Sequence, residues 1–513
     1  MNHLISLAGI GLLAGLLPAQ AQRKSVIKHQ QPNIILFLVD DMGWQDTSVP
    51  FWTQRTPFND RYHTPNMVRM AKLGVKFTQA YACPVSSPSR VSLLTGMNAA
   101  RHRVTNWTLE KNTSTDAKDP DLIFPIWNVN GITPTPSVER AVYATTLPML
   151  LQKAGYTTIH CGKAHFGAKD TPGEEPKNLG FDINIAGHAA GGPATYQGLK
   201  NFGNDDLGQP TSVWSIPGLK KYHGKDINLT EALTIEALHA VDSVRNNGNP
   251  FFLYMSHYAV HAPIEANNQF IKNYENSGLD KTEAKYASMI EGMDKSLGDI
   301  MDYLERNNLE KNTIILFMSD NGGLSAVARG GEPHTHNRPL ASGKGSAYEG
   351  GIREPMMLIW PDVAKPNSIC DKYLIIEDFF PSILQMAGLK KFNTVQIIDG
   401  ISFIPFLNDK SDPSKNRPLF WHYPNRWGET GPGIGTFSSV RLNDWKLIYY
   451  HTSQKIELFN ITNDISETKN LADKEQTMVK KLSKVLGEYL RKVNAQMPMN
   501  KHTGKAVPYP DQM

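Results

Sequence analysis

Two pairs of oxygen-bearing side chains follow apolar runs that are typical of buried strands. Asp40 and Asp41 come directly after a run that ends at Val39, and Asp320 and Asn321 come after another such run. In open α/β sheets, ligands bind beyond the carboxyl ends of the strands, so two such ends can meet in one site. Three carboxylates and an amide oxygen suit calcium or magnesium, whereas zinc favours histidine or cysteine. Either pair alone is more often a simple turn after a strand.

The segment Cys83–Gly96 (CPVSSPSRVSLLTG) contains residues that could supply a nucleophile. Cys83 is a nucleophile by residue type, while Ser86 stands at a different distance from Arg90. A serine- and proline-rich turn that caps a helix would explain the Pro and Ser residues. It would not explain why an arginine and a Leu-Thr-Gly triplet follow at fixed distances along the segment. The distance of each candidate nucleophile from these residues therefore decides which one reacts.

These side chains need a scaffold of strands and helices, and the sequence predicts one. Apolar runs typical of strands that are covered on both faces occur at residues 33–39, 157–161, 251–255, 313–318 and 356–360, with a shorter strand at 75–81. Helices are expected from Thr64-Pro65 to Gly74, from Thr146-Leu147-Pro148 to Gly155, and from about Thr282 to Leu304. Strands that alternate with helices indicate an α/β fold with a large, mostly parallel central sheet flanked by helices.

The character of the sequence changes from about Ser411. Residues 438–450 and 455–459 are typical of antiparallel strands, and residues 475–493 are typical of a closing helix. We therefore expect a smaller C-terminal α+β subdomain with an antiparallel sheet. The predicted organisation is a leader at 1–21, a catalytic domain at 22–410 and the C-terminal subdomain at 411–513.

The first residues predict a secreted protein. Met1–Ala21 is apolar and ends in Ala19-Gln20-Ala21, the small-x-small pattern of a signal-peptidase site. The run is short for a membrane span of about 20 residues, and no later segment is long and apolar enough to cross a bilayer. With three cysteines, no disulfide framework is expected. A net charge of +4 over 513 residues gives no indication of nucleic-acid binding.

The spacing inside the serine-rich segment resembles the signature of the type I sulfatases, members of the alkaline phosphatase superfamily. That signature begins with a Cys or Ser that is oxidised to formylglycine, followed by Pro at +2, Ser at +3 and Arg at +4. Counting from Ser86 satisfies all three positions, and Leu94-Thr95-Gly96 follows as in the family. Counting from Cys83 places Val85 and Ser87 where Pro and Arg are needed. The resemblance therefore implies that Ser86 becomes the modified residue, 3-oxoalanine.

The resemblance covers nearly the whole mature chain. Further family-like elements are Gly162-Lys163-Ala164-His165, His261-Ala262-Pro263, Gly343-Lys344-Gly345, Glu349–Arg353, Val440-Arg441 with Trp445-Lys446-Leu447, and Asp464–Leu471. A lone lysine or histidine has an ordinary structural explanation, but these elements follow in family order at successive strand ends. The resemblance implies an alkaline phosphatase-like fold and a sulfuric ester hydrolase.

The resemblance also implies the nucleophile and the metal. Formylglycine made from Ser86 would hydrate to a gem-diol on one calcium ion, for which magnesium is less suited, and one hydroxyl would attack sulfur in line. The metal would lower the pKa of that hydroxyl and bind a sulfate oxygen. The implied metal ligands are Asp40, Asp41, Ser86, Asp320 and Asn321.

The same resemblance assigns the charged and acid–base groups. Lys163 and Lys344 would neutralise sulfate oxygens, and Arg90 would orient the modified residue. His261 is the candidate general acid toward the leaving sugar oxygen, with Lys344 beside it. His165 would take the proton from the second hydroxyl, so that sulfate leaves and the aldehyde is restored. Histidine suits both tasks because its pKa lies near neutrality.

Sulfated carbohydrate is the implied substrate class, with action at chain ends. Aromatic faces and amide or guanidinium donors bind hydroxyl-rich rings, and Trp107 and Trp127 are among the plausible contacts. The residues predicted to contact the sugar are His336, Asn337, Arg338 and His422.

A Ser-type signature implies oxidation by an anaerobic radical maturase and hence a bacterial source, with the enzyme periplasmic or at the cell surface of a Gram-negative bacterium. Two alternatives stay open. One is a phosphodiesterase or phosphonate monoester hydrolase of the same superfamily. The other is a non-catalytic protein that binds sulfated glycans, which would follow if Ser86 is never oxidised. Lys163, His165, His261 and Lys344 argue against the second alternative, because binding alone needs no paired acids.

Overall fold

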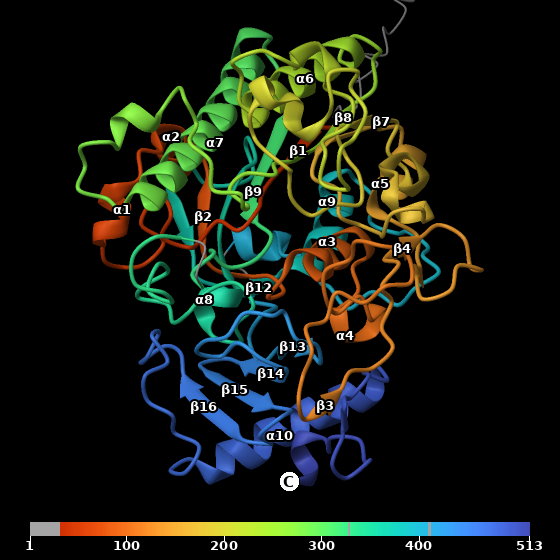
Figure 1. Ribbon diagram of the computed structural model, residues 1–513, viewed down its shortest axis with the longest axis vertical. Coiled ribbons are helices and arrows are strands. Elements are labelled where there is room, and N and C mark those ends of the chain that lie inside the picture. The colour runs from red at the N-terminus through yellow and green to blue at the C-terminus, as the bar shows by residue number, and fades with distance from the viewer. Residues whose placement is uncertain (1–30, 327–328, 409–411) are drawn as a thin grey trace, which may run out of the picture. The chain divides into compact units, whose positions relative to one another are not determined.

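The large sheet forms where the sequence predicts it. In the computed structural model, which describes residues 31–326, 329–408 and 412–513, it consists of β1 (Asn33–Val39), β2 (Val75–Tyr81), β6 (Thr157–Gly162), β7 (Ile183–Ile185), β8 (Phe251–Ser256), β9 (Thr313–Ser319), β10 (Arg353–Ile359), β11 (Ser368–Cys370) and β12 (Leu374–Ile375) (Figure 1). The strand order is β11-β2-β10-β9-β1-β8-β6-β7, with β12 beside β2. β1 pairs in parallel with β8 and β9, while β10 is antiparallel to both of its neighbours. The expected mostly parallel sheet is confirmed.

Both faces of this sheet are buried, as the continuous apolar runs predict. Successive side chains of a strand point to opposite faces, so β1 supplies two different cores. Ile34, Leu36 and Leu38 belong to one core, and Ile35, Phe37 and Val39 belong to the other; each is at most 1% exposed.

Helices cover the two faces. The helices are α1 (Pro57–Arg61), α2 (Pro65–Leu73), α3 (Ser86–Thr95), α4 (Ala99–His102), α5 (Leu147–Lys153), α6 (Leu229–Val244), α7 (Lys281–Arg306), α8 (Glu349–Ile352), α9 (Phe379–Met386) and α10 (Gln476–Lys492). α3, α5 and α9 contribute to the core that contains Leu36, whereas α2, α6 and α7 contribute to the core that contains Phe37. The predicted α2 and α5 begin with Pro at the first or second helical position, where its missing N–H costs no hydrogen bond.

A second, antiparallel sheet follows in the C-terminal part of the chain (Figure 1, blue). Its strands, in order, are β13 (Leu419–Tyr423), β14 (Phe437–Leu442), β15 (Trp445–Tyr450) and β16 (Ile456–Asn460). α10 places Leu482, Leu486 and Leu490 on one face, and these pack with Val440 and Leu447 of the sheet. The sequence indicated β14, β15, β16 and α10; β13 was not among the expected strands.

Two short strand pairs complete the strands of the described residues, β3 (Leu122–Ile123) with β17 (Met499–Asn500) and β4 (Ile132–Thr133) with β5 (Val142–Tyr143). Residues Gln31–Met513 form one compact unit. The predicted domain boundary at residue 411 lies within residues 409–411, which are outside the described residues. The predicted leader at 1–21 is outside them as well, so both stay predictions.

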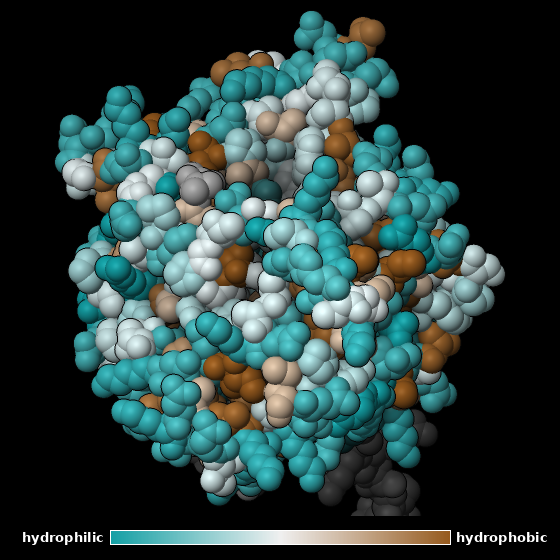
Figure 2. Space-filling model, turned by 60° about the horizontal axis from the view of Figure 1, so that its bottom comes forward, coloured by the Kyte–Doolittle hydropathy of each residue, from teal (hydrophilic) through white to brown (hydrophobic). Residues whose placement is uncertain are grey.

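The surface agrees with a chain whose apolar residues are mostly buried. On the face drawn in Figure 2, hydrophilic side chains dominate and hydrophobic ones gather in small separate groups. In the described part of the chain, no helix combines the length and the apolar character that crossing a membrane requires.

A buried charge cluster joins the two sheets. Nζ of Lys446, on β15, lies 3.0 Å from Oε1 of Glu349 and 2.6 Å from Oε1 of Glu467, and all three side chains are fully buried. The second carboxylate oxygen of Glu349 accepts hydrogen bonds from Tyr81 and Arg353 of the large sheet. Although burial opposes it, Lys446 and Arg353 lower the pKa of Glu349 to about 2. The cluster therefore fixes the C-terminal sheet beside α8.

Removal of this central cation should destabilise the protein strongly. In Lys446→Met, two buried carboxylates lose their shared partner, and we expect the free energy of unfolding to fall by about 3–5 kcal/mol. Chemical denaturation followed by circular dichroism measures the loss. Lys484→Met is the matched control, because Lys484 pairs with Glu488 in solvent, where a pair contributes less than about 1 kcal/mol. Equal losses in the two variants would contradict this account.

Candidate active site

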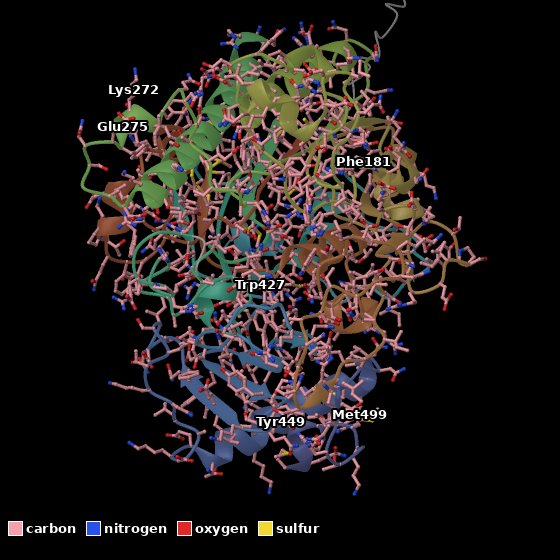
Figure 3. The ribbon with its side chains drawn as sticks, viewed as in Figure 1. Phe181, Lys272, Glu275, Trp427, Tyr449 and Met499 are labelled. Atoms are coloured by element: carbon pink, nitrogen blue, oxygen red, sulfur yellow. The ribbon has the colours of Figure 1, made fainter. Side chains whose placement is uncertain are left out.

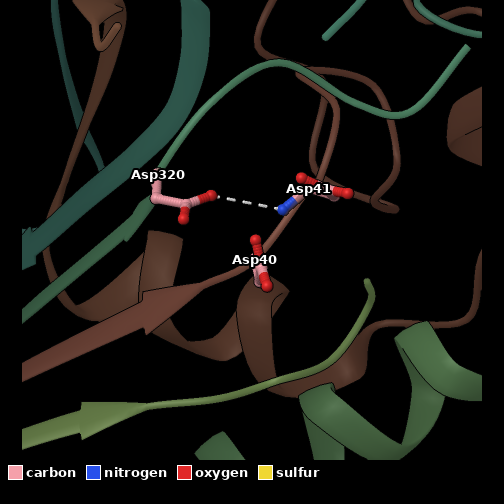
Figure 4. A group of neighbouring side chains, drawn as sticks. All are labelled: Asp40, Asp41 and Asp320. Carbon is pink, nitrogen blue, oxygen red and sulfur yellow. Dashed lines mark hydrogen bonds between the residues drawn. The ribbon is translucent and has the colours of Figure 1, made fainter. Parts of the chain in front are cut away.

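The acidic residues predicted from the sequence meet at the ends of two neighbouring strands. Val39 and Ser319 pair in the parallel register of β1 and β9, so the residues that follow them, Asp40 and Asp320, lie side by side. The backbone N–H of Asp41 donates to Oδ1 of Asp320 at 3.3 Å (Figure 4). One oxygen from each of the three carboxylates lies within 4.8 Å of the others, and all three residues are buried.

The backbone turn at Asp41 brings two consecutive side chains to the same place. In an extended strand, Asp40 and Asp41 would point to opposite faces. Asp41 instead has a φ of 59°, in the left-handed region that Asp adopts more readily than most residues. Both carboxylates therefore face the same site.

Ser86 and Asn321 complete the oxygen set. Ser86 is the first residue of α3, and its Oγ lies 3.3 Å from Oδ1 of Asp40 and 3.1 Å from Oδ1 of Asn321. The amide of Asn321 also donates to Oδ1 of Asp41 at 2.8 Å. All five predicted ligands are thus brought together. Carboxylate, amide and hydroxyl oxygens are donors that fit a hard divalent cation, so the residues present suit calcium or magnesium.

Three buried cations surround the carboxylates: the ammonium groups of Lys163 and Lys344 and the guanidinium of Arg90. Nζ of Lys163, which follows β6, lies 2.6 Å from Oδ2 of Asp40 and 2.9 Å from Oγ of Ser86. Nζ of Lys344 lies 2.7 and 2.9 Å from the two carboxylate oxygens of Asp41.

Arg90 stands one helical turn after Ser86 and joins the site to the sheet. Its guanidinium donates to Oδ2 of Asp320 at 2.9 Å, to Oγ of Ser256 at 2.6 Å and to the carbonyl of Lys163 at 3.1 Å. A guanidinium has donors in a fixed planar arrangement, so one side chain holds the ends of three strands together.

Burial and these charges set the protonation of the cluster. Burial and the neighbouring Asp320 raise the pKa of Asp40 well above its ordinary value, with Lys163 opposing. Lys344 holds the pKa of Asp41 low against burial, and Arg90 does the same for Asp320. Burial lowers the pKa of Lys163 to about 8, although Asp40 opposes the shift.

The two predicted histidines lie at the same site with different hydrogen bonds. Nε2 of His165 is 2.9 Å from the carbonyl of Thr108 and must donate to it, so the buried Nδ1, which has no partner, carries the free electron pair. Nδ1 of His261 is 2.7 Å from the carbonyl of Ala262, which leaves Nε2 3.9 Å from Oδ2 of Asp41. Burial and nearby cations lower both pKa values, that of His261 to about 4.

Two consecutive glycines hold these rings in place. A Cβ at Gly191 would lie 2.4 Å from Cε1 of His165, and a Cβ at Gly192 would lie 2.7 Å from Nδ1 of His261. Only residues without a side chain permit the loop to approach both imidazoles this closely. The loop therefore fixes the positions of both rings.

A cavity of about 250 Å³ opens beside the cluster. Its lining includes Ser86, His165, His261 and Lys344, together with Asp41, Val85, Trp107, Gly191, Trp214, Ala262, Leu324, Ala326, Trp427 and Glu429. Four of the six predicted catalytic residues thus line one pocket that a small ligand can enter, whereas Arg90 and Lys163 are buried at the cluster and do not line it.

The four predicted sugar contacts lie elsewhere. None of His336, Asn337, Arg338 and His422 is among the residues that line this cavity. Both ring nitrogens of His336 are engaged, with Oγ of Ser325 and the carbonyl of Gly330. The amide of Asn337 donates to two backbone carbonyls, and Arg338 is exposed.

His422 has a structural place in the C-terminal sheet. Its ring nitrogens lie 2.8 Å from Oγ of Ser438 and 3.0 Å from the carbonyl of Gln496. His336, Asn337, Arg338 and His422 therefore do not line the described cavity, and their contact with a sugar stays a prediction.

Cys83 lies outside the site, as the spacing argument predicts. The side chain belongs to the apolar core and is 4% exposed. Burial raises the pKa of the thiol, which disfavours the reactive thiolate.

Sequence reasoning missed part of the pocket. Trp107 was among the plausible contacts, but Trp214, Trp427 and Glu429 were not identified. Trp214 lies in the long loop between β7 and α6, and the other two lie in the β13–β14 loop, where no periodic pattern marks which side chain faces a ligand. Each of these loops contains one tryptophan, and that residue was the available signal.

Two protein families match the chain. Residues 32–389 match the family described as "Sulfatase", and residues 343–496 match "N-sulphoglucosamine sulphohydrolase, C-terminal". The first match includes the whole cluster at the strand ends, and the second begins at Gly343 and includes the C-terminal sheet.

Individual proteins that are similar to this chain agree with the family match. A "Sulfatase" of Formosa agariphila is 30% identical, over 98% of this chain and 96% of its own. "N-acetylgalactosamine-6-sulfatase" of Mus musculus is 30% identical, over 91% of this chain and 79% of its own. The crystal structure of "Ps i-CgsB in complex with k-i-k-neocarrahexaose" has a TM-score of 0.70 and 28% identity, with 90% of this chain and 93% of that chain covered.

The oxygen cluster should bind a divalent cation measurably. Adding Ca²⁺ to chelator-treated protein should raise the unfolding temperature, because a ligand at about 100 times its Kd stabilises the folded state by about 2.7 kcal/mol. Asp320→Asn should remove most of this calcium-dependent rise. Asp473→Asn, which changes an exposed carboxylate in the same way, should keep it. Differential scanning calorimetry with and without Ca²⁺ makes the comparison, and an unchanged rise in Asp320→Asn would contradict the ligand assignment.

Proposed function

This chain belongs to the sulfatase family and is a sulfuric ester hydrolase, and we propose that it removes sulfate from sulfated carbohydrate in a reaction that begins at Ser86. The observation that carries the proposal is the place of Ser86 Oγ, within hydrogen-bonding distance of Asp40 and Asn321 and 2.9 Å from Nζ of Lys163. A group at this position can be oriented by oxygen ligands on one side and by a cation on the other.

Ser86 would act after oxidation to formylglycine by a radical maturase, with calcium, rather than magnesium, held by Asp40, Asp41, Asp320, Asn321 and the modified residue. When present, these groups supply a hydrated aldehyde as nucleophile and a positive charge that lowers its pKa and binds sulfate. A plain serine would be left as a stable sulfate ester after one turnover, which is the reason for the oxidation.

Lys163 and Lys344 would neutralise the oxygens of the sulfate group. Both ammonium groups are buried, and electrostatic attraction is strongest where water is excluded. Burial lowers the pKa of Lys163, but Asp40 favours its charged form, and Asp41 raises the pKa of Lys344 against burial. Arg90 would hold Asp320 and the first turn of α3 in register.

His261 would protonate the leaving sugar oxygen through Nε2, because its other nitrogen is held by the carbonyl of Ala262. In the free site its pKa is about 4, and the negative charge of a bound sulfate ester would raise it. His165, with a free electron pair on Nδ1, would accept the proton that must be removed to release sulfate.

The substrate class is proposed from the pocket and the relatives. Three tryptophans line the cavity, and aromatic faces bind the apolar faces of sugar rings. Relatives named for N-acetylgalactosamine 6-sulfate and a neighbour in complex with a neocarrahexaose support a carbohydrate substrate. We propose exo action by an exported bacterial enzyme, because a cavity of about 250 Å³ suits a terminal sugar unit better than the middle of a chain.

The place of the reacting group can be tested with two variants. Sulfate release from sulfated sugars by the matured protein should be abolished in Ser86→Ala. Cys83→Ala should lose some stability but keep turnover, since Cys83 lies in the core and not in the pocket. Ion chromatography measures sulfate, with phosphate esters as controls for the alternative phosphohydrolase activity. Full turnover by protein in which mass spectrometry finds Ser86 unoxidised would contradict the proposal.

The roles of the two histidines can be separated by the leaving group. His261→Ala should lower kcat/KM for sugar sulfates by about 10²–10⁴-fold, as is typical when a general acid is lost. For aryl sulfates with acidic phenols, which leave without a proton, the loss should be less than about tenfold. His165→Ala should lower kcat for both substrate classes alike, because release of sulfate follows cleavage of the ester bond in each. If His261→Ala also affects both alike, His261 is not the leaving-group acid.

A further inference from the structure

The pocket has its positive charge on one side only. Among the described residues that line it, Lys344 is the only lysine or arginine, and Lys163 lies behind it at the cluster. Nζ of Lys344 is bound to Asp41 and lies 5.6 Å from the ring centre of Trp427. The pocket therefore supplies cations for one anionic group, next to Ser86.

Glu429 adds a negative charge to the same lining. It belongs to the loop that joins β13 to β14 and is partly exposed. In the described part of the chain, no hydrogen-bond donor or cation pairs with its carboxylate. Its charge and its hydrogen-bonding capacity therefore remain available to a ligand in the pocket.

The loop that carries Glu429 is fixed against the catalytic segment. A Cβ at Gly345 would lie 2.4 Å from Cε3 of Trp427, so the indole packs directly on the residue after Lys344. Figure 3 places Trp427 beside α8, above the C-terminal sheet. Glu429, two residues later, is held at the pocket by this contact.

Apart from Asp41 and the two histidines of the cluster, the remaining lining residues are uncharged, and their aromatic side chains suit a sugar ring. Trp107 and Trp214 lie with ring centres 6.4 Å apart and planes inclined at 39°. The indole Nε1 of Trp107 is buried and has no hydrogen-bond partner, so it can donate to a ligand oxygen. Donors and apolar faces recognise hydroxyl-bearing sugars, and none of these groups compensates a second sulfate.

From this distribution we propose that Glu429 makes the pocket selective for a sugar unit that carries a single sulfate. Its carboxylate accepts hydrogen bonds from hydroxyls of that unit and repels a second sulfate on the same ring. The inference rests on the proposed function, which it deepens by naming the substrate class. Like charges without a compensating partner disfavour the wrong ligand, and this gives specificity more than affinity.

The test compares singly and doubly sulfated monosaccharides that share the scissile sulfate. Wild-type matured enzyme should have the higher kcat/KM for the singly sulfated sugar. Glu429→Gln removes the charge but keeps the shape, and should reduce this preference about tenfold, chiefly through faster turnover of the doubly sulfated sugar. The preference of the wild type should also shrink as salt is added, because the repulsion is screened.

Glu275→Gln is the matched control. Glu275 is exposed and lies far from Trp427 in Figure 3. The Glu275→Gln variant changes the net charge by the same amount as Glu429→Gln, so its preference for the singly sulfated sugar should equal that of the wild type. An unchanged preference in Glu429→Gln, or an equal loss on both sugars, overturns the inference while sulfate release itself still supports the proposed function. Titration calorimetry of both sugars with Ser86→Ala and Ser86→Ala/Glu429→Gln measures the same selectivity as binding, independently of turnover.

Discussion

Three carboxylates that are buried at the ends of neighbouring strands must be balanced by positive charge, and much of this molecule is arranged around that constraint. An unpaired carboxylate in the interior costs several kcal/mol, so the parallel register that brings Asp40 and Asp320 together also demands partners for them. Lys163, Lys344 and Arg90 arrive from three separate segments of the chain. The order of the strands and the start of α3 are therefore tied to one local balance of charge.

The same buried ion pairs also explain how the Ser86 side chain is held at the carboxylate cluster. Ser86 lies at the first turn of α3, and Arg90 on the same helical face binds the strand ends, so the helix cannot shift without breaking buried ion pairs. The loop with Gly191 and Gly192 restrains the two imidazoles from the other side. The site is thus held by elements whose own packing is fixed, and little of it depends on exposed, mobile groups.

The sequence predicted this centre well because its residues follow strand ends. A buried strand is recognised by its apolar run, and the residue after it has a known place, which is why Asp40 and Asp320 were found; Lys163 was implied by the family resemblance. The lining from long loops was not predictable in the same way, since no period governs which side chain of a loop faces inward. Trp214 was missed for this reason. His422 lies instead on β13, a strand that the sequence did not indicate, and its ring contacts Ser438 and Gln496.

The loop between β13 and β14 reaches the pocket from a sheet that carries none of the residues at the strand ends. Different stretches of the chain therefore supply the cluster at the strand ends and this wall of the pocket, and they are joined through buried Lys446 and the contact of Trp427 with Gly345. Sequence changes confined to this loop could therefore alter which sugars fit the pocket during evolution, while the residues at the strand ends stay unchanged.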